Sequence, residues 1–410
     1  SPYNIYNDIS VPNGQTLIID PGVNVDFQGQ FSFKIYGSLS AIGTGSQPIV
    51  FTVADTTGFL ADTITTAGGW HGIRFFDYSG IGADVSSLKH CSISYTKLDT
   101  GAYFAGCGGL IVERPLAIEN CEIFQNRGIG VSTIITCYTS TTGDLHISDC
   151  NFHDNSIVNG HVLFVETAPA THAYLTNNKF SGNTGFNIIS AGDVNLDFIN
   201  NEVYNNTTYD ASISIKTGAM INNVLLRGNR IHHNHSDRCA ALVCFGGNYK
   251  IDANLFANNQ HTLAGPCGEV FGGGAMFLLT DSFHFYNTYY NVTNNLIANN
   301  FSADFGAGIE VLQANASITN NDIVNNQGNS NSGIYIFNSF GPYGYHSAVE
   351  IKNNLFLNNT NGGSGYYDSS NVTIFELDTL RYDHNWSEHP FYKDVYSTAT
   401  TSIFCPSDTT

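Results

Sequence analysis

One short motif recurs along most of the chain and limits its fold more than any other feature. In each copy, a reference Cys or Asn has an apolar residue three positions before it and another two positions after it. The ten reference positions are Cys91, Cys121, Cys150, Asn178, Asn201, Asn229, Asn254, Asn295, Asn321 and Asn354. A further Asn follows five positions later in nine of the ten copies. Repeats of this length, 23 to 41 residues apart, predict a solenoid.

The pattern inside each repeat predicts β-strands. Apolar residues alternate on both sides of the turn-forming Asn, which indicates two short strands meeting at a bend. A further apolar strand follows in most copies, for example at 162–165, 213–215 and 334–336. The 41 glycines and the many asparagines argue against helices. We therefore expect an all-β chain, a right-handed parallel β-helix of about 12–13 coils with an inward Asn ladder and a coil spacing of about 4.8 Å.

The repeat also predicts the organisation of the chain. Residues 1–85 are expected to form N-terminal capping coils, and 86–360 the regular coils. The long step from Asn254 to Asn295 predicts an insertion near 265–290. Residues 361–410, rich in Tyr and Phe and containing Trp386, break the repeat and are expected to form a C-terminal cap, because an open coil end exposes a sheet edge that aggregates.

Charge and composition exclude several partners. With 15 Lys+Arg against 34 Asp+Glu, the net charge is -19, so nucleic acid would be repelled. No run approaches the roughly 18 apolar residues of a membrane helix. The chain starts at Ser1-Pro2 without an initiator Met, as a mature or trimmed ectodomain would. We expect an extracellular or cell-surface protein with no cofactor.

Several segments resemble known β-helix families. The stretches VPNGQTLIIDPGVNVDF, GSLSAIGTGSQPIVFT and GGWHGIRF, within residues 9–76, resemble the opening coils of secreted parallel β-helix proteins of bacteria. The later FHDN, FSGN, FANN and FLNN, with GGGAM at 272–276, are similar to the repeats of polymorphic outer-membrane proteins, which are surface adhesins. The resemblance implies the fold and a secreted location. It does not imply one activity, because this fold serves lyases, hydrolases, adhesins and fibres.

The outward positions next to the reference residue define a candidate site. Because the reference and the residue two positions later point inward, the residues one and three positions later point outward and stack into columns. In the first half these columns contain His153, Lys179, Glu202, Tyr204, Arg230 and His232. They are candidate ligand-binding residues, suited to proton abstraction beside a cation-neutralised uronate. The alternative is an ordinary ion ladder with aromatic neighbours.

Two functional hypotheses follow. The first is a non-catalytic secreted or cell-surface β-helix with a structural, adhesive or carbohydrate-binding role, as in an extracellular fibre or array. The alternative is an enzyme that cleaves acidic polysaccharide, a lyase before a glycoside hydrolase, which would act through Lys179, Glu202, Arg230, Tyr204 and His232.

The second half of the same columns is apolar. Leu255, Leu296 and Leu355 stand one position after the reference, and Ala257, Ala298, Val324 and Leu357 stand three positions after it. An apolar stripe on a solvent-facing surface predicts a cover. The C-terminal tail or the 265–290 insertion would provide it, or else a neighbouring subunit through self-association.

The positions of the nine cysteines within the repeat predict which are buried and which can form disulfides. Cys91, Cys121 and Cys150 replace Asn in the inward column and are expected to form a buried thiol stack. Cys107 and Cys137, each 16 residues after a reference, would allow a disulfide, as would Cys239 and Cys267, about one coil apart.

Two further sets of polar residues bear on metal binding and glycosylation. Three histidines, His232, His233 and His235, lie close together, but strand geometry separates them, so no metal site is expected. Candidate glycosylation sequons occur at Asn205, Asn206, Asn234, Asn291, Asn300, Asn315, Asn358, Asn371 and Asn385.

Overall fold

The computed structural model describes most of the chain as strands and turns. The described residues are 1–61, 67–76, 86–98, 107–128, 133–139, 144–167, 171–217, 222–239, 241–262, 272–280, 288–329, 332–337, 347–361, 371–375, 377, 379–387, 395–397 and 401–404. Within these ranges there are strands and no helix. The chain divides into two compact units, Ser1–Asp197 (unit 1) and Phe198–Thr410 (unit 2), and each is described separately.

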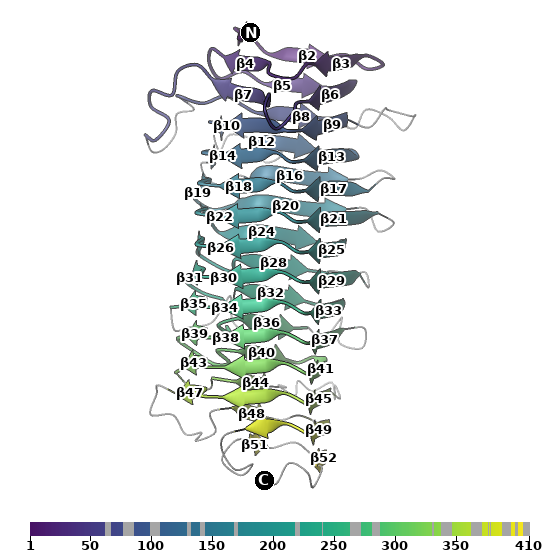
Figure 1. The fold of residues 1–410 in the computed structure, drawn as a ribbon, viewed down its shortest axis with the longest axis vertical. Helices are drawn as coiled ribbons and strands as arrows, with labels where there is room; N and C mark the ends of the chain where they lie inside the picture. The colour runs from purple at the N-terminus through teal and green to yellow at the C-terminus, as the bar shows by residue number, and fades with distance from the viewer. Residues whose placement is uncertain are drawn as a thin grey trace, which may run out of the picture. The chain divides into compact units, whose positions relative to one another are not determined.

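Each coil of unit 1 contributes one strand to each of three long parallel sheets, named A, B and C here (Figure 1). Sheet A contains β1 (Tyr3–Ile5), β4 (Asn24–Phe27), β7 (Ile49–Val53), β10 (Cys91–Ser94), β14 (Glu122–Phe124), β18 (Asn151–His153) and β22 (Lys179–Ser181). Sheet B contains β2 (Ile9–Val11), β5 (Phe33–Ile35), β8 (Ile73–Phe75), β12 (Cys107–Val112), β16 (Thr133–Thr139), β20 (His161–Thr167) and β24 (Asn187–Gly192). Sheet C contains β3 (Thr16–Ile19), β6 (Ser38–Ile42), β9 (Ser86–Lys89), β13 (Leu116–Glu119), β17 (Leu145–Ser148) and β21 (His172–Thr176). Two-residue strands form a short sheet D of β11 (Lys97–Leu98), β15 (Arg127–Gly128), β19 (Ser156–Ile157) and β23 (Thr184–Gly185).

Unit 2 repeats this arrangement, and β25 (Asn195–Ile199) spans the boundary. Its sheet A strands are β26 (Glu202–Tyr204), β30 (Arg230–His232), β34 (Leu255–Ala257), β38 (Leu296–Ala298), β42 (Asp322–Val324), β46 (Leu355–Leu357) and β50 (Trp386–Ser387). Its sheet B strands are β28 (Ile213–Lys216), β32 (Leu242–Phe245), β36 (Met276–Leu279), β40 (Ile309–Leu312), β44 (Ile334–Phe337), β48 (Val372–Phe375) and β51 (Val395–Ser397). Its sheet C strands are β29 (Asn223–Arg227), β33 (Asn248–Asp252), β37 (Tyr289–Thr293), β41 (Asn315–Thr319), β45 (Ala348–Lys352), β49 (Thr379–Asp383) and β52 (Thr401–Phe404). Its sheet D strands are β27 (Thr207–Thr208), β31 (His235–Ser236), β35 (Gln260–His261), β39 (Phe301–Ser302), β43 (Gln327–Gly328) and β47 (Thr360–Asn361).

The chain is a right-handed parallel β-helix, which confirms the fold predicted from the repeat. Two details differ from the prediction. Each regular coil has a fourth, two-residue strand in sheet D, between the bend after sheet A and the start of sheet B. Sheets A and B each have seven strands in each unit, so there are one or two more coils than the 12–13 predicted. The additional coils come from residues outside the ten motif copies.

Left-handed residues make two corners in each coil. In one coil, Asn120 (φ 53°) precedes Cys121 and Gln125 (φ 51°) precedes Asn126, so a residue with positive φ stands before each inward corner position. Asn occupies many of the equivalent positions, and glycine takes two of them, at Gly182 and Gly228. These residue types tolerate positive φ better than β-branched residues do. The sharp corners allow four short strands to close into one coil.

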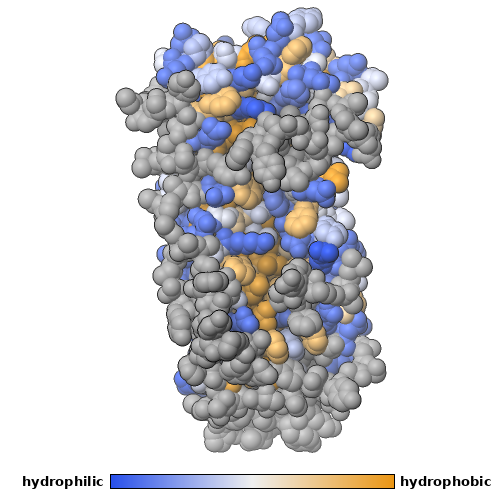
Figure 2. Space-filling view, turned by 180° about the vertical axis from the view of Figure 1, so that it is seen from behind, coloured by the Kyte–Doolittle hydropathy of each residue, from blue (hydrophilic) through white to orange (hydrophobic). Residues whose placement is uncertain are grey.

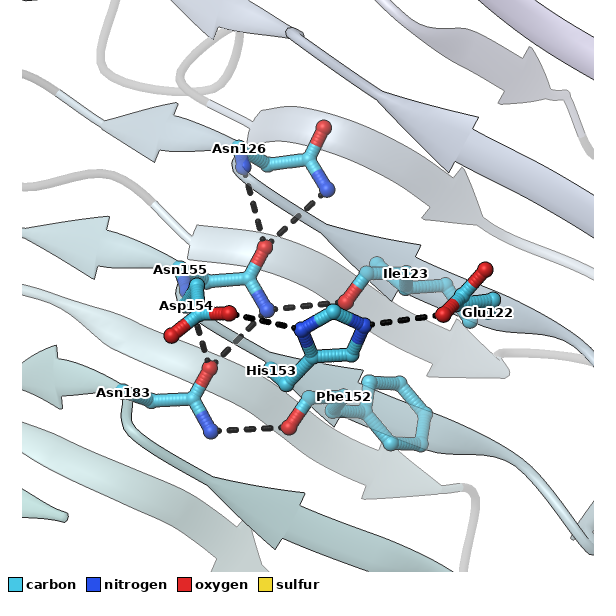
Figure 3. Close-up of polar contacts among 8 residues, drawn as sticks. All are labelled: Glu122, Ile123, Asn126, Phe152, His153, Asp154, Asn155 and Asn183. Carbon is cyan, nitrogen blue, oxygen red and sulfur yellow. Dashed lines mark hydrogen bonds and ion pairs between the residues drawn. The ribbon is translucent and has the colours of Figure 1, made fainter. Parts of the chain in front are cut away.

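The inward Asn side chains replace backbone hydrogen bonds at these corners. Asn300 accepts a hydrogen bond from the backbone N–H of Asn259 (3.1 Å) through Oδ1. Its Nδ2 donates to the carbonyl of Phe256 (3.0 Å) and to Oδ1 of Asn326 (3.0 Å). The same pattern recurs at Asn126, Asn155 and Asn183, drawn in Figure 3. Each amide therefore satisfies corner groups of its neighbouring coils that the strand ladders do not reach.

The predicted inward apolar columns form the core. All ten residues two positions after the reference are fully buried, Ile231 among them, and the ten residues three positions before it are at most 1% exposed. Asn201 and Asn229 are direct neighbours, because the Asn201 N–H donates to Asn229 Oδ1 over 2.8 Å. The alternation of inward and outward residues predicted from the sequence is therefore confirmed.

Three cysteines occupy the inward Asn column of unit 1, as predicted. The Cys91 N–H donates to Cys121 Sγ and the Cys121 N–H to Cys150 Sγ, each over 3.4 Å. The column then continues into Asn178, whose Oδ1 accepts from the Cys150 N–H (3.0 Å). Each thiol also donates to a carbonyl, such as that of Leu88 for Cys121 (3.4 Å). The thiols thus act as weaker substitutes for the amide.

Strands are present where an insertion and a cap were predicted. Met276–Leu279 is the regular strand β36, so the additional residues of this coil fall in 263–271 and 281–287, outside the described residues. Past residue 360, β48 to β52 continue the sheets, and Asn385 continues the ladder by accepting from the Asn354 N–H (2.9 Å). The prediction that the repeat breaks at residue 361 is therefore wrong, while the capping role stays a prediction.

The structure tests part of the predicted disulfides. Register places Cys107 opposite Thr133 and Cys137 opposite Val112, so the predicted Cys107–Cys137 bond is wrong: Cys137 is a buried thiol inside the coil. Cys239 is disulfide-bonded. Its predicted partner, Cys267, lies outside the described residues.

Burial corrects part of the predicted glycosylation. Asn206, Asn234, Asn300 and Asn371 are at most 2% exposed and lie in the inward ladder or on it, so they cannot accept a glycan in the folded chain. Asn205 and Asn358 are exposed at corners, and Asn291, Asn315 and Asn385 are half-buried.

The ladder predicts a large effect for one inward Asn. Asn300→Ala removes the partner of the Asn259 N–H and of the Phe256 carbonyl, and we expect a loss of about 3 kcal/mol in the free energy of unfolding. The control is Asn299→Gly, because residue 299 is exposed and has φ 56°, which suits glycine. Urea unfolding of both variants measures the difference, and equal losses would contradict the ladder's role.

Thiol chemistry tests the cysteine column. Burial raises the pKa of Cys150 and of Cys244, and thiolates are the reactive form. Because all four thiols are buried, we expect iodoacetamide to leave Cys91, Cys121, Cys150 and Cys244 unmodified in the native protein and to modify all four in urea, as read by peptide mass spectrometry. Modification of Cys150 under native conditions would contradict its inward position.

Candidate functional site

The predicted site residues fall on the outward face of sheet A, in two separate groups. In unit 1, Lys179 stands in register with Asn151, and His153 with Ser181. In unit 2, Glu202 stands opposite Arg230, and Tyr204 opposite His232. His153 and Lys179 therefore belong to unit 1, and the other four predicted residues form a cluster within unit 2.

Glu202 is the centre of the unit 2 cluster. Its Oε1 lies 3.2 Å from Nε2 of His232 and 3.6 Å from Nε of Arg230. The Tyr204 ring stacks on His232, with centroids 5.3 Å apart and an interplanar angle of 15°. Nδ1 of His232 contacts Nδ1 of His233 at 2.9 Å. The Arg230 side chain is 62% exposed, so its guanidinium faces solvent beside the aromatic pair.

His153 is the centre of a similar cluster in unit 1, shown in Figure 3. Its Nε2 lies 3.0 Å from Oε1 of Glu122 and its Nδ1 lies 2.8 Å from Oδ2 of Asp154. Phe124 stacks on the ring at 5.1 Å. Burial alone would lower the pKa of His153, but the hydrogen bonds with Asp154 and Glu122 outweigh it, and the pKa is raised above that of an ordinary histidine.

These clusters favour binding over proton abstraction. A base that removes a proton from a sugar ring needs an unprotonated nitrogen open to the substrate. Both ring nitrogens of His232 already have partners, Glu202 and His233, and both ring nitrogens of His153 have carboxylate partners. The Arg230 guanidinium, beside the stacked Tyr204 and His232 rings, is the group of this cluster that is most open to a ligand.

The apolar stripe further along sheet A is partly covered, with Ala257 and Ala298 buried, while much of the two segments predicted to cover it lies outside the described residues. Leu296 is 41% exposed, and Leu255 and Leu355 are half-buried. Trp386 continues the column from Leu355 and is 55% exposed. Self-association through this stripe therefore stays a prediction.

A different outward surface in unit 2 is both apolar and covered. On sheet B, Val243, Phe277, Leu279 and Leu312 point away from the core yet are at most 8% exposed, and they pack with Ala211 and Cys239. Phe245 and Phe337 pack against the same cluster. Figure 2 shows the molecule from this side, with a hydrophobic strip between hydrophilic stretches.

Glu310 lies in this apolar surface and is not among the residues that the repeat pattern singles out. It stands in register between Phe277 and Tyr335. Its side chain is fully buried, and neither carboxyl oxygen has a hydrogen-bond partner in the part of the chain that the structure describes. Burial, and then the nearby Asp304 carboxylate, raise the pKa of Glu310 well above that of an ordinary glutamate. The sequence offers no signal for it, because Glu310 occupies an outward strand position, where a charged residue is ordinary.

Unit 1 carries a basic cluster on its own sheet B. Lys34 and Arg74 are register neighbours, although like charges in direct opposition destabilise a sheet. Asp8 lies 2.6 Å from the Lys34 ammonium. Burial, and then the Arg74 guanidinium, lower the pKa of His71. The cluster concentrates positive charge in an otherwise acidic chain.

Comparisons with known proteins add similarity in fold. No family model and no curated protein matches the chain. One similar structure is the catalytic domain of a GH87 α-1,3-glucanase in complex with nigerose (12% identity, TM-score 0.31), where the match covers 90% of this chain and 64% of that chain. Another is a mannuronic acid specific polysaccharide family 6 lyase from human gut microbiota (11% identity, TM-score 0.36), covering 97% and 91%. A third is an alginate lyase from Paenibacillus sp. str. FPU-7 (10% identity, TM-score 0.20), covering 97% and 99%. Similarity at this level carries no information on activity.

Two kinds of feature are absent from the described residues. No helix in this part of the chain is long and apolar enough to cross a bilayer. Over the same ranges, His, Cys, Asp and Glu side chains form no group of three or more suited to a metal ion.

The His153 cluster makes a prediction about pH. We expect His153 to titrate above the ordinary value of 6.5, and Glu122→Gln to move its midpoint downward by removing one of the two carboxylates. Because the folded-state pKa is raised, the cluster's contribution to stability is complete below about pH 6.5 and is lost as the pH rises through the folded value. Histidine NMR titration measures the midpoint. Glu119→Gln, whose carboxylate pairs with Lys89 instead, is the control and should leave it unchanged.

Proposed function

We propose that this chain is an extracellular polysaccharide-binding parallel β-helix, in which the Tyr204–Arg230–His232 cluster contacts the sugar chain. The observation that supports this most directly is the pairing of a stacked aromatic platform with a guanidinium that is 62% exposed. Flat aromatic faces bury the apolar face of a sugar ring, and guanidinium groups donate to hydroxyl or carboxylate oxygens. The strands of sheet A place these groups on a regular surface along which an extended polymer can lie.

An acidic polysaccharide fits the charges better than a neutral one. Arg230 presents a positive group on sheet A of unit 2, and Lys34 with Arg74 does so on sheet B of unit 1. In a chain of net charge -19, these local cations offset a general repulsion of anions. A uronate carboxylate is the sugar substituent that such groups recognise.

The proposed role of the sheet A cluster is non-catalytic. Lys179, Glu202, Tyr204, Arg230 and His232 were the residues of the alternative lyase hypothesis. Elimination requires a base next to a cation, and the histidine of this cluster is engaged on both nitrogens. Glu202 accepts a hydrogen bond from His232 and forms a longer ion pair with Arg230. An adhesive or fibre-forming role would add contacts through Leu255, Leu296 and Leu355.

Affinity electrophoresis in gels containing polygalacturonate, alginate or neutral β-glucan tests this proposal. We expect acidic polymers to retard the wild type, and Arg230→Ala and Tyr204→Ala each to weaken binding about tenfold, because one charge-assisted contact or one stacking platform is lost. Lys250→Ala, a change of an exposed cation on sheet C of the same unit, is the control and should bind as the wild type does. Unchanged binding in Arg230→Ala would contradict the assignment of the site.

A further inference from the structure

A group of basic side chains lies on the outer face of sheet B in unit 1. Lys34 of β5 and Arg74 of β8 occupy directly opposed outward positions on adjacent strands, whose places in the coil are labelled in Figure 1. Adjacent strands are about 4.8 Å apart, so the register holds the two cations close together. His71, just before β8, is near enough to feel both charges. Like charges in direct opposition weaken a sheet, so the fold gains nothing from this pair.

Asp8 offsets part of this positive charge. Its Oδ2 lies 2.6 Å from the Lys34 ammonium, and its Oδ1 accepts a hydrogen bond from the Ser32 N–H over 2.9 Å. Of the charges that act on His71, those of Lys34 and Arg74 are positive and that of Asp8 is negative. The side chains of Lys34 and Asp8 are 33% and 47% exposed, so a dissolved anion can reach their ion pair.

The three basic residues supply hydrogen-bond donors at one place. An ammonium and a guanidinium carry several N–H donors each and no acceptor, so Lys34 and Arg74 can each bind more than one oxygen. Burial, and then the Arg74 guanidinium, lower the pKa of His71. The half-buried His71 ring is therefore neutral at neutral pH, and an anion placed beside it would favour its protonated form.

An aromatic pair follows the two cations along the same strands. Tyr36 and Phe76 stand two residues after Lys34 and Arg74, so their side chains point to the same face of the sheet. The two rings stack with centroids 4.8 Å apart and an interplanar angle of 10°, and both are half-buried. Next to such an apolar neighbour, the attraction between a cation and an anion is stronger than in open water.

We propose that Lys34, Arg74 and His71 form a binding site for the sulfate ester groups of an extracellular polysaccharide. A carboxylate presents two oxygens, which suits a single guanidinium, whereas a sulfate ester presents three free oxygens, one for each basic residue. The sugar ring that carries the sulfate lies beside the edges of the Tyr36–Phe76 pair. This assignment rests on the proposed binding of acidic polysaccharide, and it names the substituent recognised in unit 1.

Asp8 competes with the sulfate for Lys34. Without ligand, the Asp8 carboxylate holds the ammonium. A bound sulfate takes that place, and the carboxylate turns toward solvent. Removing the charge of Asp8 should therefore strengthen sulfate binding, whereas the loss of a merely structural contact would not. Asn is the suitable replacement because its side-chain oxygen can still accept from the Ser32 N–H.

Charge-matched variants test the proposal. Affinity gels at constant salt compare dextran sulfate, polygalacturonate and uncharged dextran. We expect Lys34→Gln and Arg74→Gln each to bind dextran sulfate about tenfold more weakly than the wild type, and Asp8→Asn to bind it about threefold more tightly. The control is Lys89→Gln, which removes a 41% exposed cation paired with Glu119 on sheet C of the same unit. It changes the net charge equally and should bind as the wild type does.

Inorganic sulfate gives a measurement at the site that needs no polysaccharide. Sodium sulfate, added at constant ionic strength, should shift the NMR signals of the His71 ring and raise its pKa, and it should leave the His153 ring unchanged. Lys34→Gln should weaken this response. Arg230→Ala should keep it in full, so failure of the sheet A assignment and failure of the sulfate site give different results.

Three results would overturn the sulfate site. They are wild-type affinity for dextran sulfate in Lys34→Gln and Arg74→Gln, weaker binding in Asp8→Asn, and His71 signals that inorganic sulfate leaves unchanged. Binding of polygalacturonate as tight as that of dextran sulfate, with the same dependence on Lys34, would overturn the choice of sulfate over carboxylate.

Discussion

The asparagine ladder is the interaction on which the rest of this structure depends. A closed coil of short strands needs sharp corners, and at a corner the backbone groups point away from the strand ladders. The inward amide solves this problem because one side chain both accepts and donates between coils, as Asn300 does toward Asn259 and Phe256. A thiol can occupy the same position, as at Cys121, but with longer contacts. The hydrogen bonds at the corners, more than apolar burial, therefore determine which residues of neighbouring coils align.

Because the alignment of neighbouring coils is fixed, the neighbours of each outward side chain can be predicted from the sequence. Once Asn201 and Asn229 are neighbours, Glu202 must face Arg230, and Tyr204 must face His232. The side chains have little freedom to choose other partners, so their chemistry follows from register. The result on sheet A is a set of ion pairs and stacked rings whose polar groups satisfy one another. Such a surface has few reactive groups, and it suits recognition of a polymer with the same translational repeat.

The sequence was sufficient to predict this much because the ladder repeats locally. Inward columns, outward columns and the Glu202 cluster all follow from positions within three residues of the reference. A prediction that depended on equal loop lengths in two coils failed. Cys107 and Cys137 are equally far from their references, yet the connection before sheet B differs between the two coils, so Cys107 aligns with Thr133 instead. The last coils escaped detection because Asn385 lies in a copy without the full motif.

Glu310 could not be found in this way, for a physical reason. Its position in the strand predicts an outward side chain, and outward normally means solvated. The turn at Asp304–Gly306 and the stacking of Phe305 on Tyr335 change this, and neither is encoded in the repeat. The outward polar residues of sheet A and sheet B therefore differ in whether they have hydrogen-bond partners. On sheet A the members of the Glu202 cluster pair with one another, whereas on sheet B the buried Glu310 carboxyl has no hydrogen-bond partner among the described residues.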